Sequence, residues 1–310
     1  MTDTLPVSRA AELDDAAQTP RWLVTDLWAS AGVGVIGGHP KSCKSWLGLE
    51  LATAVATATP ALGRFHVPAP ATALVYLAED ALHSVKERLV ALCAHRRLHI
   101  ESLDVHVITA PTLRLDRASD IQRLDNTLSA IHPRLLLLDP LVRLHSGDEN
   151  SSTEISRLLD SLRALQRKHD TAIVLVHHTR KSGAHRQGQA LRGSSDIWAF
   201  GDSNLFINQL NSKLVLSVEH RAAPAPDSIT IALTGDPPHL NIVDDDSTPP
   251  SLEQRVMDEL TRASTPLSRT ELRRRLAVNN KKLGDTIDKL VHSGSVARTQ
   301  DGITIFQLSP

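Results

Sequence analysis

The chain has 310 residues, 41% of them hydrophobic, and a formal net charge of −1 at pH 7. A chain of this size and composition can bury a full core and has room for one large domain and a small one, which excludes an intrinsically disordered protein. No apolar run reaches the roughly 18 residues of a membrane span, and the N-terminus lacks the basic and apolar segments of a signal peptide. Since Cys43 and Cys93 are the only cysteines, we expect no disulfide framework and predict a cytoplasmic protein without membrane contact.

The small net charge hides a basic segment near the C-terminus. Between residues 262 and 301, nine Lys or Arg stand against four Asp or Glu, so this stretch carries +5 and the remainder −6. A basic end on an acidic body is compatible with contact to a polyanion, although a solvated helix face is the commoner meaning of such a run.

From Gly34 to Arg180, short apolar runs alternate with longer amphipathic stretches. This alternation predicts an α/β fold with a mostly parallel sheet and helices on both faces. The predicted strands are 33–36, 73–77, 105–108, 135–138 and 172–176, and the clearest helices are 81–95 and 153–169. Three later runs, 204–207, 214–219 and 229–233, predict an antiparallel extension of the sheet.

A charged stretch that ends in two prolines, 244–250, is typical of a linker between domains. We therefore divide the chain into a flexible N-terminal segment 1–20, a large domain 21–243, the linker, and a small domain 251–310. The small domain is predicted to hold a helix over 252–262, a second opened by Ser268 with Glu271 at capping-box spacing, and a third opened by Asn279 or Asn280. With a hairpin around Asp301-Gly302, these elements predict a winged helix.

A phosphate-binding loop is predicted between the strand 33–36 and the helix that begins near Trp46. The segment follows G-x-x-x-x-G-K-[ST] except at one position: Gly38-His39-Pro40-Lys41-Ser42-Cys43-Lys44-Ser45. Backbone amides at a helix N-terminus would bind phosphate oxygens, Lys44 would contact the outer phosphates, and Ser45 would bind Mg²⁺. ATP and Mg²⁺ are therefore the expected ligands, and an ordinary glycine turn is the alternative.

Cys43 stands where this loop usually has glycine. If the position needs a positive φ, a Cβ there costs on the order of 1–2 kcal/mol. Next to Lys44 and a helix N-terminus, the thiol is also expected to be unusually acidic and nucleophilic, and its alkylation to block nucleotide binding. The alternative is a small side chain that simply packs there.

Acidic residues end two of the predicted strands. Asp139 follows 135–138 and is the candidate ligand of magnesium, through a metal-bound water. Glu79 and Asp80 follow 73–77, at the strand edge where open parallel sheets place their chemistry. Glu79 is our candidate to orient or deprotonate the attacking water, with Asp80 as the second choice and a helix N-cap as the structural alternative for Asp80.

Polar residues also follow the strand 172–176. His177 and His178 come first, and His178 is the candidate to sense the γ-phosphate and pass its presence to the next segment. That segment, 181–195, is rich in Gly, Ser, His and Arg without apolar periodicity, which is typical of a mobile loop.

Together these motifs resemble a family, the RepA-like hexameric replicative helicases and related AAA_25-type ATPases of the RecA-like fold, which are often encoded on plasmids and other mobile elements. The resemblance runs from about Trp22 to Leu233. It is carried by five segments: Gly38 to Leu47, Tyr76-Leu77-Ala78-Glu79-Asp80, Leu138-Asp139-Pro140-Leu141, Val176-His177-His178 and Leu191-Arg192-Gly193-Ser194-Ser195.

The resemblance implies ATP hydrolysis at the subunit interfaces of a ring, with a hexamer expected. Lys44, Ser45, Glu79 and Asp139 would act in one subunit, and an arginine finger would come from its neighbour. Arg221 best fits the finger, although Glu219 replaces the lysine of the usual Lys-x-Arg. Arg192 is the competing finger or else a DNA-facing residue, and a surface salt bridge is the alternative for both arginines.

The predicted winged helix suggests DNA as the partner. Its third helix would enter the major groove with its N-terminal residues, Asn279, Asn280, Lys281 and Lys282. The lysines would contact phosphates and the asparagines adenine edges. The sequence therefore favours an ATP-driven motor acting on DNA, with an ATP-gated DNA-binding regulator or loader as the alternative. An ATPase that remodels protein partners is the third possibility.

Overall fold

The computed structural model describes residues 7–12, 22–148, 151–178, 195–210, 213–243, 252–263, 265–276, 278, 280–299 and 302–305. It divides into two compact units, Met1–Val243 and Asp244–Pro310. The predicted linker 244–250 lies outside the described residues, as does most of the segment 1–20, in which the described part includes a short 3-10 turn, Ala10–Glu12.

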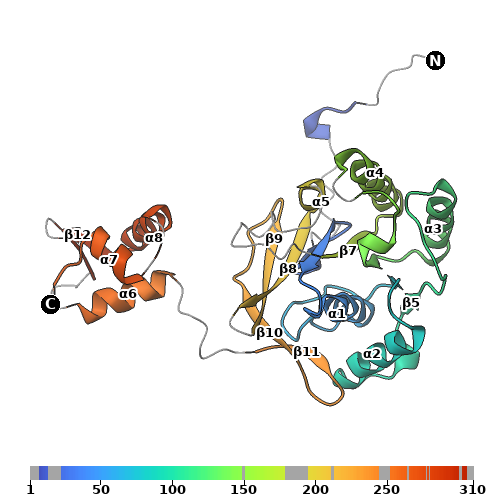
Figure 1. Cartoon of the computed structure of the whole chain (residues 1–310), viewed down its shortest axis with the longest axis horizontal. Coiled ribbons are helices and arrows are strands. Elements are labelled where there is room, and N and C mark those ends of the chain that lie inside the picture. Colours follow the sequence, from blue (N-terminus) through green and yellow to red (C-terminus); the bar gives the residue numbers. More distant parts are fainter. Residues whose placement is uncertain are drawn as a thin grey trace. The chain divides into compact units, whose positions relative to one another are not determined.

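A long mixed sheet runs through the first unit (Figure 1), and its strands follow the order β11-β10-β9-β8-β3-β7-β6-β4-β5. The parallel part consists of β3 (Val33–Gly38), β4 (Ala73–Leu77), β5 (Val105–Val107), β6 (Leu135–Asp139), β7 (Ala172–His178) and β8 (Ser203–Leu210). The antiparallel part consists of β9 (Lys213–His220), β10 (Ile229–Thr234) and β11 (His239–Ile242). A separate antiparallel pair, β1 (Trp22–Val24) and β2 (Trp28–Ala29), precedes the sheet.

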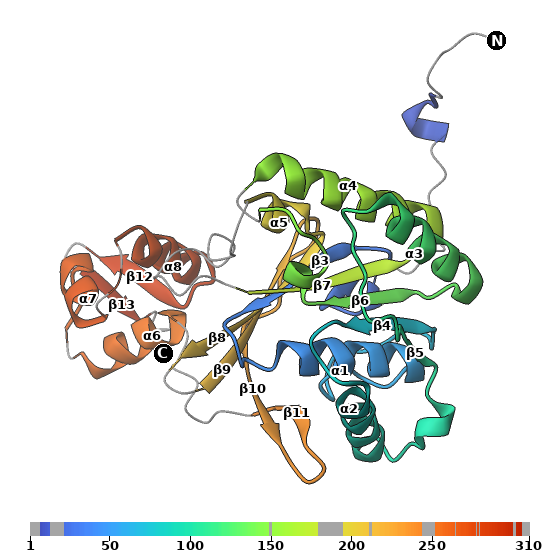
Figure 2. The ribbon, with the colours of Figure 1, turned by 45° about the vertical axis from the view of Figure 1, so that its right-hand side comes forward.

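Helices cover both faces of the sheet (Figure 2). On one face lie α1 (Lys44–Thr57) and α2 (Leu82–His95), and on the other lie α3 (Ala118–Ile131), α4 (Ser152–His169) and α5 (Ser195–Phe200). Alternate residues of the central strands feed two separate hydrophobic cores. In β6, for example, Leu135 and Leu137 join the core beneath α1, whereas Leu136 and Leu138 join the core beneath α3 and α4. A strand buried on both faces needs apolar residues throughout, which explains the continuous run of leucines.

The α/β fold with a mostly parallel sheet is confirmed, because the predicted strands coincide with β3 to β10 to within a few residues at each end. The antiparallel extension was predicted without β11. That strand, His-Leu-Asn-Ile, places only Leu240 in the core and therefore has no apolar run to reveal it. Among the described residues, no helix is both long and apolar enough to cross a membrane.

The second unit contains α6 (Leu252–Arg262), α7 (Arg269–Leu276), α8 (Asn280–His292) and the antiparallel pair β12 (Val296–Thr299) and β13 (Gly302–Ile305). A single bridge, Leu267 to Ile303, adds a third extended segment to this pair. The predicted capping box of α7 is confirmed. The Ser268 hydroxyl accepts a hydrogen bond from the Glu271 amide at 3.2 Å, and Glu271 Oε2 accepts one from the Ser268 amide at 2.9 Å.

Candidate functional site

The carboxyl ends of four neighbouring strands converge on one pocket in the first unit. Its volume is about 290 Å³, and it is lined by Lys41, Ser42, Cys43, Lys44, Ser45, Trp46, Glu79, Arg88, Asp139, Pro140, His178 and Leu233. The loop 38–45 follows β3, Glu79 follows β4, Asp139 ends β6 and His178 ends β7. In an open parallel sheet ligands bind at the carboxyl ends of the strands, and here residues as far apart as Lys41 and Leu233, 192 positions, meet in one pocket.

The backbone of the loop is shaped to receive an anion. A Cβ at Gly38 would lie 2.7 Å from both the Ile207 carbonyl oxygen and the Ser42 hydroxyl, so only glycine fits. Lys41 and Cys43 both have left-handed backbones, with φ of 64° and 62°, and α1 begins at the next residue, Lys44. Alternating left- and right-handed residues before a helix turn successive N–H groups toward one point, which makes a cradle for phosphate oxygens.

Lys44 is held inside this cradle, with 5% of its surface exposed. Its Nζ donates a 2.7 Å hydrogen bond to the His39 carbonyl oxygen, which lies in the same loop. Burial lowers the pKa of Lys44, and the nearby carboxylate of Asp139 opposes that shift. A bound phosphate would supply the negative charge that this buried ammonium lacks.

Asp139 and Ser45 form the natural place for a cation beside the cradle. Asp139 is 5% exposed, and its Oδ2 has no hydrogen-bond partner among the described residues. Burial raises the pKa of Asp139 to about 6, while the Ser45 hydroxyl and Lys44 act in the opposite direction. Because an orphaned buried carboxylate oxygen next to a serine hydroxyl matches the oxygen ligands of Mg²⁺, these two residues fit the metal that accompanies a nucleotide.

The raised pKa of Asp139 predicts how stability depends on pH in the absence of metal. Between about pH 4 and pH 6 the folded chain keeps a proton that the unfolded chain releases, so stability falls as pH rises through this window. Above pH 6, burial of the charged Asp139 carboxylate lowers the free energy of unfolding by on the order of 2–3 kcal/mol. We therefore expect Asp139→Asn to stabilise the metal-free protein at pH 7.5 and to lose most of that advantage at pH 4.5. Urea unfolding at the two pH values checks this, and an equal difference at both would contradict it.

The two acids after β4 make different contacts. Glu79 accepts a 2.6 Å hydrogen bond from Arg143 Nε, and both side chains are about half exposed. Asp80 is bound by both terminal nitrogens of Arg88, at 2.8 and 2.9 Å. The N-cap alternative for Asp80 was wrong, because Ala81 is the N-cap of α2 and no side chain caps that helix. Each acid is thus paired with an arginine, and of the two only Glu79 is among the residues that line the pocket.

His178 stands beside the loop, since it pairs in register with Gly38 across β3 and β7. Arg221 follows β9 and so lies at the opposite end of the strands. Its amide donates to the Asp202 carbonyl oxygen, and its Nε lies 3.6 Å from Asp202 Oδ1, near the start of β3. Arg221 therefore lies far from the pocket that the loop 38–45 forms in the same chain.

The residues predicted to contact DNA are only partly described. Arg192 and Asn279 lie outside the described residues, as does the predicted loop 181–195 up to Ser194. Asn280 is the exposed first residue of α8, and Lys281 and Lys282 follow it in that helix.

The expectation of an acidic thiol at Cys43 was wrong. The backbone at Cys43 has a positive φ of 62°, but burial raises the pKa of the thiol, and the opposing charges of Lys44 and Arg88 are the smaller effects. The local sequence reveals that Lys44 is next to the thiol. The desolvation of the thiol, in contrast, depends on all the residues that line the pocket.

Cys43 should therefore react slowly with iodoacetamide at pH 8, more slowly than a free cysteine, because little of it is thiolate. Complete labelling should still block ATP binding, since the thiol lines the phosphate pocket. Cys43→Ser, which leaves the buried Cys93, is the control for the site of labelling. Full ATP affinity after stoichiometric labelling, or reaction faster than free cysteine, would contradict this view.

Sequence reasoning missed Arg88, which joins the pocket to a larger groove. Its guanidinium lies 5.7 Å from the centre of the Trp46 ring. Both residues also line a groove of about 740 Å³ between α2 and the turn that joins β10 to β11, where Pro237 and Pro238 lie. One feature of the sequence could have revealed it. Arg88 lies two turns into the predicted helix that follows Asp80, so its side chain can reach that carboxylate.

Two comparisons with known proteins agree with this geometry. Residues 2–184, more than half of the chain, match the family model AAA_25, an AAA domain. The crystal structure of the RadB recombinase is similar in fold, with a TM-score of 0.52 and 17% sequence identity over 69% of this chain and 92% of that chain. At such low identity the second match shows the fold alone, which is a RecA-like core. The chain therefore belongs to the AAA_25 family and is a P-loop ATPase built on that core.

Proposed function

We propose that this protein hydrolyses ATP in order to act on DNA, as a ring-forming helicase or translocase of the RepA-like type. The observation that carries the ATPase part is the convergence of Lys44, Ser45, Glu79, Asp139 and His178 on one pocket. These are the residue types that phosphoryl transfer requires, because that reaction depends on positioning and on stabilising charge.

Each side chain has a distinct task in this proposal. The loop amides and Lys44 hold the phosphates, and Glu79 orients the attacking water. Ser45 and Asp139 would hold Mg²⁺, which when bound would supply positive charge to the phosphate oxygens. His178 senses the outer phosphate at the end of β7, from which the segment 181–195 continues. The groove that shares Trp46 and Arg88 with the pocket offers space for the nucleoside.

The case for DNA rests on the second unit and on the fold. Three helices, a hairpin and the local charge of +5 favour a winged helix that contacts DNA, with Asn279, Asn280, Lys281 and Lys282 toward the groove. One solved structure of similar fold is that of a recombinase, and recombination is a reaction of DNA. Arg221 lies far from its own pocket, which suits an arginine finger acting between the subunits of a ring, with Arg192 as the competing candidate.

A second candidate is an ATP-gated DNA-binding regulator or loader without unwinding activity. The observation that favours it is the aromatic content of 3%, which supplies few side chains on which the bases of a single strand could stack.

Steady-state ATP hydrolysis, measured alone and with single-stranded or duplex DNA at one stated salt concentration, tests the proposal. We expect DNA to raise turnover several-fold, and strand separation in a helicase assay would select the motor. ATP-dependent duplex binding without unwinding would select the regulator. If neither single-stranded nor duplex DNA changes turnover and neither is bound, both the motor and the regulator are overturned, and a protein substrate is indicated.

A further inference from the structure

Four arginines lie on the short helix α7 of the second unit, and they differ in what they contact. The helix is fixed at its start by the Ser268 and Glu271 capping box, and its apolar residues Leu272 and Leu276 are buried in the core of the unit. The arginines are therefore presented on a fixed backbone. They are Arg269, Arg273, Arg274 and Arg275, and all four are exposed.

Two of these arginines are used within the unit. Arg275 Nη1 lies 3.3 Å from Glu259 Oε2 on α6, and Arg269 Nη2 donates a 2.6 Å hydrogen bond to the Asn280 carbonyl oxygen at the start of α8. The guanidinium groups of Arg273 and Arg274 have no hydrogen bond or ion pair of 4.0 Å or less with any described residue. On the same helix, Oε2 of Glu271 accepts hydrogen bonds from the amide and hydroxyl of Ser268, and the charge of Arg274 acts on this carboxylate without a hydrogen bond.

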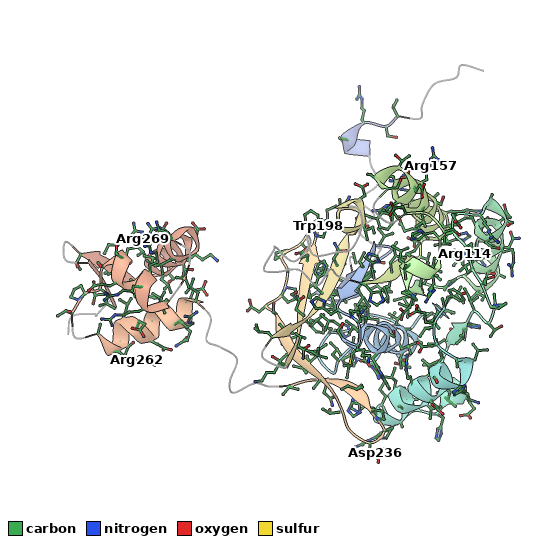
Figure 3. The ribbon with its side chains drawn as sticks, viewed as in Figure 1. Arg114, Arg157, Trp198, Asp236, Arg262 and Arg269 are labelled. Atoms are coloured by element: carbon green, nitrogen blue, oxygen red, sulfur yellow. The ribbon has the colours of Figure 1, made fainter. Side chains whose placement is uncertain are left out.

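We call the surface formed by Arg273 and Arg274 the α7 face; these adjacent residues point about 100° apart around the exposed side of the helix. Arg269 and Arg273 are four residues apart and so stand on the same side of the helix. The bond from Arg269 to Asn280 places the first residue of α8 beside them. Arg262, at the end of α6, lies on the opposite side of the unit from Arg269 (Figure 3).

We propose that the α7 face binds the sugar-phosphate backbone of duplex DNA, through Arg273 and Arg274. A guanidinium offers a planar fork of donors that matches phosphate oxygens, and two such groups without an acceptor are suited to an external anion. In helix-turn-helix proteins the helix before the recognition helix crosses the backbone, which is the position of α7 before α8. This inference rests on the proposed action on DNA and adds phosphate contacts from α7 to those expected of Lys281 and Lys282 on α8.

The test measures binding of the full-length protein to a fluorescent 30-base-pair duplex by anisotropy, between 50 and 200 mM NaCl. Each phosphate contact contributes about 0.9 to the slope of log K against log salt, so Arg273→Ala with Arg274→Ala should reduce the slope by about two. Affinity at the lowest salt should fall at least tenfold. Alanine favours helix, and a thermal melt checks that the unit remains folded.

Two further double variants make the result specific. Arg273→Lys with Arg274→Lys should restore most of the slope, because the charges return. Arg262→Ala with Lys289→Ala removes the same charge from side chains that pair with Glu259 and Glu253 on α6, and its slope should match that of the wild type.

The outcomes separate this inference from the proposed function. If the wild type binds duplex but both alanine pairs reduce the salt slope by the same amount, net charge alone explains binding. The assignment of the phosphate contacts to the α7 face would then be wrong. An unchanged slope in Arg273→Ala with Arg274→Ala also overturns it, while the action on DNA stands. A wild type that binds no duplex at any salt overturns the action on duplex DNA, and with it this inference.

Discussion

Lys44→Ala should reduce ATP hydrolysis by at least 100-fold and weaken ATP binding. The ammonium is buried within the loop and bonds to the His39 carbonyl oxygen, so its side chain is already ordered where the outer phosphates would lie. Removal of one preorganised donor from a developing charge typically costs about 3–4 kcal/mol, which corresponds to a factor of roughly 100 to 1,000. Initial rates under saturating ATP, with binding measured by calorimetry, check this expectation.

Lys41→Ala is the matched control, because Lys41 belongs to the same loop but is exposed. Its loss should lower turnover less than tenfold, since a solvated charge contributes little. Equal losses in the two variants would show that loop shape or total charge, rather than the buried ammonium, governs catalysis. Hydrolysis at the wild-type rate in Lys44→Ala would contradict the assignment of this pocket to ATP.

Glu79→Gln is expected to lower turnover by 100-fold to 10,000-fold while ATP still binds. The amide keeps the size of the side chain but cannot take a proton from water, and general base catalysis is commonly worth this much. The ion pair with Arg143 is half exposed and contributes little to stability, so the variant should fold normally. Single-turnover hydrolysis together with nucleotide affinity separates a loss of chemistry from a loss of binding.

Asp80→Asn tests the other acid of the same strand end. Asp80 holds Arg88 through two hydrogen bonds, and Arg88 in turn lies over the ring of Trp46, which lines the pocket. We expect weaker ATP binding with a modest change in turnover under saturation. A loss of turnover as large as that of Glu79→Gln, with binding intact, would transfer the role of the base to Asp80.

Much of the fold follows from short-range patterns in the sequence. The runs Ala73–Leu77 and 135–138 are apolar throughout because each faces a core on both sides, so they are recognised without knowledge of their neighbours. The capping box of α7 is equally local, because its partners Ser268 and Glu271 are three residues apart. The phosphate loop also belongs to this class, since strand, loop and helix are contiguous.

Other features depend on residues far apart in the chain. The order of strands places β3 between β7 and β8. His178 therefore lies beside Gly38, whereas Arg221, which follows β9, lies at the opposite end of the strands. No periodicity within a strand encodes which strand lies next to it. The contact between Glu79 and Arg143 joins residues 64 positions apart and is equally invisible to local patterns.

The amino-acid sequence by itself determined the chemical types at the site and the strand ends that carry them, but it left the backbone conformation of Cys43 open. Only the tertiary structure decided the electrostatic state of those groups, because desolvation depends on everything that surrounds a side chain. Burial raises the pKa of Cys43 although its neighbour in sequence is a lysine, and it raises that of Asp139 although Ser45 and Lys44 lie close by. Local order arises from propensity and short-range hydrogen bonds, whereas the charge that a site holds is a property of the assembled pocket.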